Sequence, residues 1–493
     1  MDHLFILKFF LPLLWAISFA FAPSKNQKAI KSFALIGGLV GLFYSVQFHF
    51  DLTSATKGEL YELYRLNLPY FFNLTYTFAA DGLSSLLLML NAFLLLIVVV
   101  ATWEIKTEKL RLYYFLIFAL TWAVNGSLLS TSLYGFYIFW EAMLIPLFIL
   151  VGVFGGENRR YASFKFFMMT AAGSILMLAA MGYMSALAYR INGSYDLNYT
   201  VIKMLSLRYD GFWSPQSLVF WAFTIAFFLK VPVFPLHSWL PEAHVEAPTA
   251  GSIILAGILL KLGIYGFIRF VIGFYPEAVD ANKDFIMSLG AVGVVYGALT
   301  AWVQKDIKKL VAFSSISHMG YIVIGIFSKN ASALEGAIFQ MVAHGISTPG
   351  LFICVHYLYS RLHTKKMDMY GGLAKVMPKF AVLFFIITAG SMAVPMTCGF
   401  VGEFLIIAGT YSVNKAVAIV AATGIILSPI YLLKMYHLTA FGDIVHEENK
   451  NLKDVNWIEM IPLLALSILT VLLGLYPKLI TGMISQSINY LLM

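Results

Sequence analysis

The stretch FFLKVPVFP, residues 227–235, ends an apolar run that begins near Leu218. It places Lys230 inside a segment with the composition of a membrane-spanning helix and then adds Pro232 and Pro235. A lysine at the centre of a bilayer is disfavoured by about 2.5–3.5 kcal/mol on insertion scales. A proline removes a backbone donor, and two prolines break the helix that keeps backbone groups satisfied in lipid. The buried lysine and the two helix-breaking prolines are each unfavourable in a bilayer. Because they lie so close together, the stretch predicts a functional site.

The composition is that of a membrane protein with many crossings. Of the 493 residues, 60% are hydrophobic and 12% are charged, whereas about 25% of the residues in a soluble domain are charged. Apolar runs of roughly 20 residues, long enough to cross a bilayer as helices, recur from end to end. The first run, Leu4 to Ala22, lacks a basic start and a small-residue cleavage site, so we expect a retained helix rather than a signal peptide.

The sequence carries no signature of redox, nucleotide or metal chemistry. Its two cysteines lie in separate apolar runs, without the spacing of an iron–sulfur or disulfide framework. The loop with His237, Glu242, His244 and Glu246 is expected to be solvated rather than metal-binding. The net charge of +8 is spread over short loops and does not indicate a nucleic-acid partner. We therefore expect no cofactor and no metal in this chain.

The hydrophobic pattern predicts an all-α polytopic membrane protein with about 14 transmembrane helices in a single membrane domain, residues 1–493. The polar segments 51–80 and 191–214 carry no clear helix pattern. We divide the chain into helices 1–3 over 4–110, a first repeat of helices 4–8 over 111–275, a second, inverted repeat of helices 9–13 over 284–441, and a C-terminal helix and tail over 457–493.

Two of the expected helices are broken at corresponding places in these five-helix repeats. Helix 7 carries the proline pair after Lys230, and helix 12 contains AVPMTCGFVGEF, residues 393–404, in which Pro395 precedes Glu403. Paired broken helices in the two halves of a membrane protein point to a transport site near the midplane.

The loop charges predict the orientation. One alternating set of loops carries 19 basic residues: Lys25, Lys28, Lys31, Lys106, Lys109, Arg111, Arg159, Arg160, Lys165, Lys305, Lys308, Lys309, Arg361, Lys365, Lys366, Lys375, Lys379, Lys450 and Lys453. The opposite set carries 8: Lys57, Arg65, Arg190, Lys203, Arg208, Lys283, Lys329 and Lys415. The positive-inside rule places the richer set in the cytoplasm or its equivalent, with both termini on the outer side.

Six ionisable side chains are expected at membrane depth. They are Glu141, Lys230, Lys261, His318, His344 and Glu403. Such residues are rare in membrane helices and usually functional. The competing interpretations are that a lysine near a helix end extends to the interface, that an acid only joins helices, and that a histidine is a hydrogen-bonded core residue.

These residue types suit proton transfer along a lateral relay. An acid and a lysine at close range stabilise each other's charge, and separating them allows the lysine to release its proton. Histidine shuttles protons because its unperturbed pKa is about 6.5. We therefore expect Glu141 and Lys230 to form a pair whose separation controls proton movement through the other four residues.

Three stretches carry a family resemblance. FFLKVPVFPLHSWLPEAHVEAPTAGSIILAGILLKLGIYGFIRF (227–270), WVQKDIKKLVAFSSISHMGY (302–321) and FVGEF (400–404) resemble the antiporter-like subunits of respiratory NADH:quinone oxidoreductase, complex I. The resemblance runs over nearly the whole membrane domain. It implies a bundle of about 14 helices with two inverted five-helix repeats and broken helices 7 and 12.

The resemblance also implies the site and the partners. The proton-path residues of the family correspond here to Glu141, Lys230, Lys261, His318, His344 and Glu403. The implied partners are other complex I subunits, especially the flanking antiporter-like subunits, together with lipids and protons. FMN, iron–sulfur clusters and quinone are implied in partner subunits only. The implied location is the bacterial inner membrane or an equivalent energy-transducing membrane.

Within this family the resemblance is to the M-type chain, the middle of three antiporter-like subunits. Glu403 fits that type, whereas the sister subunits and Mrp-type antiporters tend to have lysine at this place. The segment VPMTCGF before VGEF departs from the usual leucine-proline followed by Thr and Asn-Phe, which puts the local hydration near Cys398 in doubt.

Three alternative functions compete with this interpretation. The first is a subunit of a multisubunit Mrp-type cation/proton antiporter, against which Glu403 and the chain length argue. The second, a light-driven pump with retinal on a lysine, is disfavoured because the expected helix count is about double what such a pump needs. The third, a passive scaffold, leaves the regular placement of midplane charges unexplained.

Overall fold

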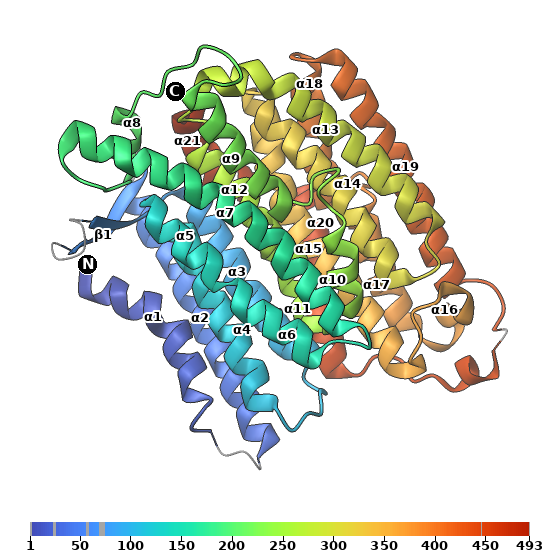
Figure 1. Ribbon diagram of the computed structural model, residues 1–493. Coiled ribbons are helices and arrows are strands. Elements are labelled where there is room, and N and C mark those ends of the chain that lie inside the picture. Colours follow the sequence, from blue (N-terminus) through green and yellow to red (C-terminus); the bar gives the residue numbers. More distant parts are fainter. Residues whose placement is uncertain (1, 23–25, 56–58, 69–73, 445, 493) are drawn as a thin grey trace.

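A computed structural model shows a bundle of closely packed helices (Figure 1). The structure describes residues 2–22, 26–55, 59–68, 74–444 and 446–492. Two lysines counted for the orientation, Lys25 and Lys57, lie outside these residues. Within them, eleven helices are long and apolar enough to cross a membrane, and the chain is an integral membrane protein.

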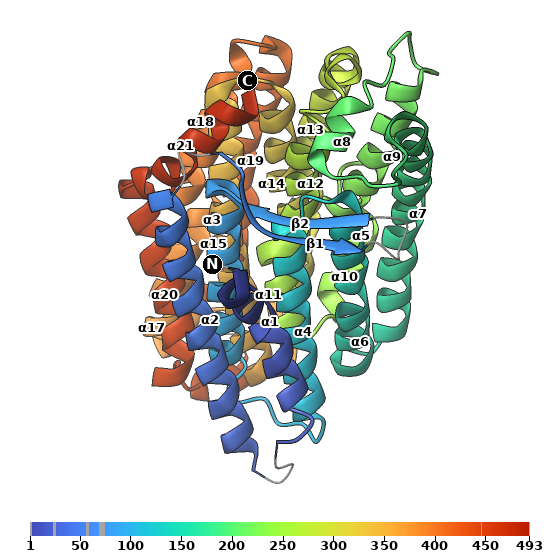
Figure 2. The same ribbon diagram turned by 90° about the vertical axis from the view of Figure 1, so that its left-hand side faces the viewer.

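The N-terminal part contains four long helices and a hairpin. They are α1 (Asp2–Ser18), α2 (Gln27–Ala55), β1 (Tyr61–Leu68), β2 (Leu74–Ala80), α3 (Gly82–Ala101) and α4 (Leu110–Leu129). The antiparallel hairpin occupies the polar segment between α2 and α3, where the sequence pattern indicated no helix. Figure 2 shows it lying across one side of the bundle, where β1 contacts α1 and β2 contacts α3, α4 and α5.

The next part of the chain contains the first interrupted segments. Its elements are α5 (Leu133–Ala142), α6 (Leu144–Phe154), α7 (Arg159–Asn192), α8 (Tyr199–Met204), α9 (Pro215–Lys230), α10 (Trp239–Glu246), α11 (Thr249–Ile254), the π-helical turn η1 (Leu255–Leu259) and α12 (Leu260–Phe270). Helix α9 ends at Lys230, directly before the two prolines, and the chain resumes as a helix at Trp239.

The remaining elements form the other side of the bundle. They are α13 (Pro276–Val303), α14 (Ile307–Phe327), α15 (Ala331–Leu362), η2 (Met367–Met369), α16 (Leu373–Val376), α17 (Pro378–Ser391), α18 (Cys398–Tyr411), α19 (Lys415–Ala440), η3 (Glu447–Asn451), α20 (Trp457–Leu475) and α21 (Lys478–Leu492). The second interruption separates α17 from α18 and contains Pro395.

The core lies along three segments at the centre of the bundle. The most apolar windows of α11–α12, α14 and α15 are 100% buried, whereas those of α2, α7 and α19 are 28%, 39% and 39% buried. A helix that is apolar around its whole circumference is buried on every side or faces lipid. The three central segments are of the first kind, so their polar side chains must find partners inside the protein.

Candidate functional site

Four of the six expected residues form a connected group at the centre of the bundle. Lys261 of α12 lies with its Nζ 2.6 Å from Nδ1 of His344 on α15. The rings of His344 and His318 of α14 have centroids 5.6 Å apart. Nδ1 of His318 lies 2.9 Å from Oε1 of Glu403 on α18. The structure therefore brings together a lysine, two histidines and a glutamate that are far apart in the sequence.

Local backbone irregularity positions Lys261. The π-helical turn η1 ends two residues before it, and such turns leave carbonyl groups with altered hydrogen bonding. The ammonium of Lys261 donates a hydrogen bond to the carbonyl oxygen of Ala256 within this turn. The lysine is fully buried, and the carbonyl and the imidazole of His344 supply the polar contacts that a buried ammonium requires.

The second interruption places two partners around His318. Ser391, the last residue of α17, has its Oγ 3.4 Å from Nε2 of His318, while Glu403 of α18 contacts Nδ1. If Nδ1 carries the proton it donates to the carboxylate, and Nε2 then accepts from the serine hydroxyl. The imidazole thus has a partner at each nitrogen, one from each side of the helix break.

Glu403 has an uncharged partner in addition to the histidine. Nε2 of Gln340 on α15 donates to Oε1 of Glu403 at 3.2 Å, whereas Oε2 has no hydrogen-bond partner among the described residues. Gly402 allows this approach, because a Cβ at that position would meet the side chain of Gln340. One carboxylate oxygen therefore remains available to accept a proton or a further hydrogen bond.

The expected pair of Glu141 and Lys230 is not in contact in this conformation. Lys230 is buried, and its Nζ lies 4.7 Å from the ring centroid of Trp140, with no hydrogen-bond partner among the described residues. Glu141, the next residue along α5, is half-buried, and its Oε1 likewise has none in that part of the chain. The aromatic face takes the place that we expected the carboxylate to occupy, because it partly stabilises a desolvated cation.

Trp140 is itself held in place by a polar contact. Its Nε1 donates to Oγ of Ser174 on α7 at 3.2 Å, and that hydroxyl donates in turn to the carbonyl of Thr170. The ring orientation under Lys230 is thereby linked to the neighbouring helix. Sequence reasoning did not select Trp140, Gln340 or Ser391, because uncharged polar side chains are common in membrane bundles and give no signal of rarity.

A buried ion pair was also missed. Asp81, the N-cap residue of α3, pairs with Arg269 of α12, and the two side chains are 2% and 3% exposed. The arginine lies over the ring of Tyr265, 5.0 Å from its centroid. The pair joins α3 to α12. The backbone amide of Gly82, the residue after Asp81, donates a hydrogen bond to the hydroxyl of Ser487 on α21. An arginine within an apolar run was the signal that could have revealed it.

The expectation of a solvated loop around His237 and His244 was wrong: most of this segment is helix α10, and both histidines are buried among aromatic and apolar side chains. The ring of His244 stacks on Phe352 at 4.5 Å, and that of His237 lies against Phe234 and Tyr296. Among the residues that the structure describes, no group of three or more histidine, cysteine or acidic side chains has an arrangement that would hold a metal ion.

Comparisons with known proteins agree on one family. A family profile described as "NADH:quinone oxidoreductase/Mrp antiporter, TM" matches residues 130–428. A NADH-quinone oxidoreductase subunit M from Rhodobacter capsulatus is 41% identical over 429 residues, covering 85% of this chain and 82% of the relative.

Two solved structures share the fold. A chain of respiratory complex I from Thermus thermophilus superposes with a TM-score of 0.86 at 27% identity, covering 99% of both chains. A chain of the Mrp complex from Dietzia superposes with a TM-score of 0.84, covering 99% of this chain and 98% of that one. The second, at 21% identity, is a likeness of fold alone.

The Asp81–Arg269 pair generates a stability prediction. Replacing Arg269 with Met leaves the Asp81 carboxylate buried without its counter-charge, and breaking a buried pair in this way costs about 3–5 kcal/mol. We expect a clear fall in the unfolding temperature of the purified protein, measured in detergent by intrinsic fluorescence. The double variant Asp81→Asn with Arg269→Met should recover part of the loss, because Asn keeps the helix cap without a charge.

The matched control is Lys375→Ala, which removes an exposed ion pair with Asp443 and should change the unfolding temperature little, since exposed pairs contribute about 0–1 kcal/mol. An Arg269→Met protein as stable as the parent would show that the pair does not stabilise the junction of α3 and α12.

Proposed function

The chain belongs to the NADH:quinone oxidoreductase/Mrp antiporter family, and from this premise we propose that it moves protons across a membrane as the M-type antiporter-like subunit of an NADH:quinone oxidoreductase. Electron transfer from NADH to quinone takes place in other subunits and drives the movement. FMN, the iron–sulfur clusters and the quinone belong to those subunits, since two separated cysteines cannot supply the four ligands of a typical cluster.

The observation that carries this proposal is the connected group of Lys261, His344, His318 and Glu403. Each member can gain and lose a proton, and the outer two contacts are within hydrogen-bond distance. The ammonium of Lys261 can pass a proton to Nδ1 of His344, and Nδ1 of His318 can pass one to the carboxylate of Glu403. The step between the two rings has no direct hydrogen bond, so it requires a ring rotation or an intervening water.

Glu141 and Lys230 form the controlling end of this relay. In the structure Lys230 rests against Trp140 rather than the carboxylate, which supports a separated state of the pair. A closed state, with the carboxylate against the ammonium, holds a proton on Lys230, and separation releases it toward Lys261. In this proposal, quinone chemistry in other subunits drives the relay by changing the distance between the Glu141 carboxylate and the Lys230 ammonium.

The architecture that we infer has about 14 crossings. The eleven long helices, α1, and the two interrupted segments α9–α10 and α17–α18 together provide them. The interruptions occupy corresponding places in the two halves, 111–275 and 284–441, which supports an inverted repeat with the relay near the midplane. The flanking antiporter-like subunits are the proposed neighbours in a bacterial inner or equivalent membrane, with both termini on its outer side.

The runner-up function, a subunit of an Mrp-type cation/proton antiporter, shares the fold and the family profile. Glu403 and the similarity to a subunit M over most of the chain favour the complex I assignment. Co-purification of flavin and iron–sulfur subunits after mild detergent extraction would support complex I, whereas a set of small membrane subunits only would support the antiporter.

The controlling pair generates the first functional prediction. We expect Glu141→Ala or Lys230→Ala to remove most NADH-driven proton pumping without preventing assembly, because each change removes one charge of the pair. Pumping is measured with a pH dye in proteoliposomes after assembly is verified on native gels. Lys434→Ala is the matched control, since it removes a lysine outside the proposed relay whose ammonium donates to the carbonyl of Trp302. Near-normal pumping by the assembled pair variants would contradict their assignment to the relay.

Glu403 generates the second prediction. We expect Glu403→Gln to lower NADH:quinone turnover and proton uptake severely, because Gln keeps the size and polarity but cannot titrate. Glu403→Asp should retain much of the activity, and Glu403→Lys should be partially functional at best, since its loaded and empty states carry the opposite charges. If the Gln variant turns over and pumps like the parent, Glu403 has only a structural role, holding neighbouring helices together through hydrogen bonds, and the protons leave by another route.

A further inference from the structure

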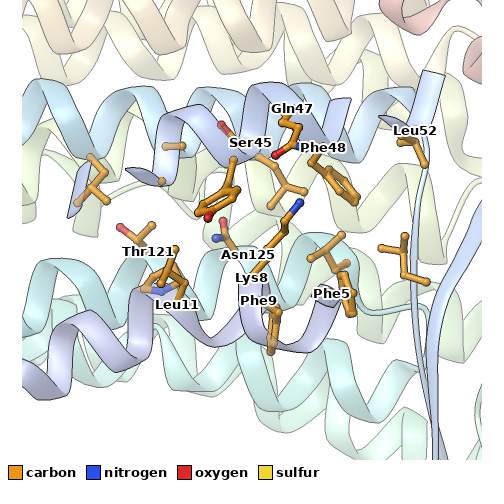
Figure 3. A pocket seen from close by; sticks show the side chains of 18 of the residues that line it. Phe5, Lys8, Phe9, Leu11, Ser45, Gln47, Phe48, Leu52, Thr121 and Asn125 are labelled. Carbon is orange, nitrogen blue, oxygen red and sulfur yellow. The ribbon is translucent and has the colours of Figure 1, made fainter. Parts of the chain in front are cut away.

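A cavity of about 280 Å³ lies within the N-terminal part of the bundle, away from the relay. Its walls come from α1, α2, α3 and α4, with the β1 strand at one end (Figure 3). Figure 3 shows Lys8 extending from α1 into the space that faces Gln47 and Phe48 of α2. No residue of this cavity takes part in the proposed proton path, so its shape and chemistry need a separate explanation.

The lining of the cavity is charged toward the hairpin and mainly apolar at the other end, and the uncharged polar side chains of Ser45, Thr121 and Asn125 also contribute to it. Lys8, Tyr44 and Gln47 lie toward the hairpin, and Nζ of Lys8 is 5.2 Å from the ring centroid of Tyr44. Trp15 and Phe118 line the opposite end. Because α1 rises about 1.5 Å per residue, Lys8 and Trp15 lie roughly 10 Å apart along the helix. The space thus has the dimensions of a short length of extended hydrocarbon chain with a cation at its mouth.

The surroundings are those of a lipid-facing surface. Helix α2 is the least buried of the long apolar helices, at 28% of its most apolar window, and it exposes Leu39, Phe43 and Phe50. This exposed apolar face has the composition of a helix surface that contacts lipid. Near the apolar end these two helices are joined by the stacked rings of Trp15 and Phe33, whereas nearer the hairpin the cavity separates them.

The charge at the mouth selects an anionic group. Lys8 is half-buried and forms no ion pair among the described residues. Two acidic residues also line the cavity: Glu62 pairs with Arg65 at 2.6 Å, and Asp51 has an interaction of its own. A lysine near a membrane surface attracts anionic lipid headgroups, and an uncharged quinone ring would leave this ammonium without a counter-charge.

We propose that the cavity is a binding site for one membrane phospholipid, with an acyl chain between α1, α2, α3 and α4 and the headgroup phosphate on the ammonium of Lys8. The lipid fills the space that separates α1 from α2 and completes the packing of the N-terminal helices. Its phosphate supplies the counter-charge of Lys8 at the polar end.

The bound lipid also supports the controlling end of the relay. Phe9 forms part of the cavity wall and contacts Phe139 of α5 and Trp122 of α4, with ring centroids 5.7 and 6.0 Å apart. Phe139 precedes Trp140 and Glu141 directly in the chain. The acyl chain therefore holds the aromatic cluster against which α5 rests, so the site acts on Glu141 through packing rather than through charge.

The glycine pattern of the chain offers a matched pair of test variants. A Cβ at Gly41, which lines the cavity on α2, would meet no atom within 4 Å, so a leucine side chain introduced there has open space at its base and extends from the cavity wall. Gly182 on α7 is exposed, and a Cβ there also meets no atom within 4 Å. Gly182→Leu therefore repeats the chemical change on a membrane helix away from the cavity.

The experiment uses the assembled complex in nanodiscs that contain phosphatidylglycerol with a diazirine in its acyl chain. After irradiation, mass spectrometry locates the label. We expect labelled peptides from α1 and α2, and labelling lowered to background by Gly41→Leu but unchanged by Gly182→Leu. Lys8→Met should lower it roughly fivefold, the effect of losing one lysine–headgroup attraction, and Lys8→Arg should restore it, which separates the loss of charge from misfolding.

Three outcomes would overturn the proposal. The first is labelling of α1 and α2 that Gly41→Leu leaves unchanged, because the lipid would then lie outside the cavity. The second is equal labelling by a diazirine diacylglycerol, which lacks the phosphate, together with no effect of Lys8→Met. The third is displacement of the phospholipid by a photoreactive quinone that labels the same peptides. None of these outcomes depends on whether the relay moves protons.

Discussion

An ionisable side chain at the centre of this bundle needs polar partners inside the protein, because the apolar helix surfaces and the lipid around it offer none. This requirement explains why Lys261 contacts His344 and why His318 contacts Glu403. It also explains the irregular backbone at the site. The π-helical turn supplies a carbonyl for Lys261, and the break between α17 and α18 allows Ser391 to reach His318.

The same requirement gives the two kinds of contact different roles. Lys261, His344, His318 and Glu403 have polar partners already, the arrangement that the proposed proton exchange requires. Among the described residues the ammonium of Lys230 has no hydrogen-bond partner and lies over the face of Trp140, a weaker substitute for a carboxylate. In the proposed relay, four members are connected and Lys230 is separated from the carboxylate of Glu141, so the proposal requires a movement of α5 against α9 that brings these two charges together.

Much of this arrangement was accessible from the sequence because charged groups in apolar helices are rare. The six ionisable residues stood out for that reason, and the prolines after Lys230 and before Glu403 indicated the two interruptions. Gln340, Ser391 and Trp140 did not stand out, since their types are ordinary in membrane helices. The hairpin of β1 and β2 was not anticipated either, because a polar segment between two apolar runs is equally compatible with a loop.

The proposed relay is tested most directly at His344, whose ring lies between Lys261 and His318. Replacing it with Gln keeps the size and the hydrogen-bonding capacity but removes the ability to titrate. The measurement is the number of protons translocated per NADH oxidised by the assembled complex in proteoliposomes, with the exposed His437→Gln as control. We predict a lower ratio for His344→Gln alone; a ratio equal to that of the parent would contradict proton transfer along this path.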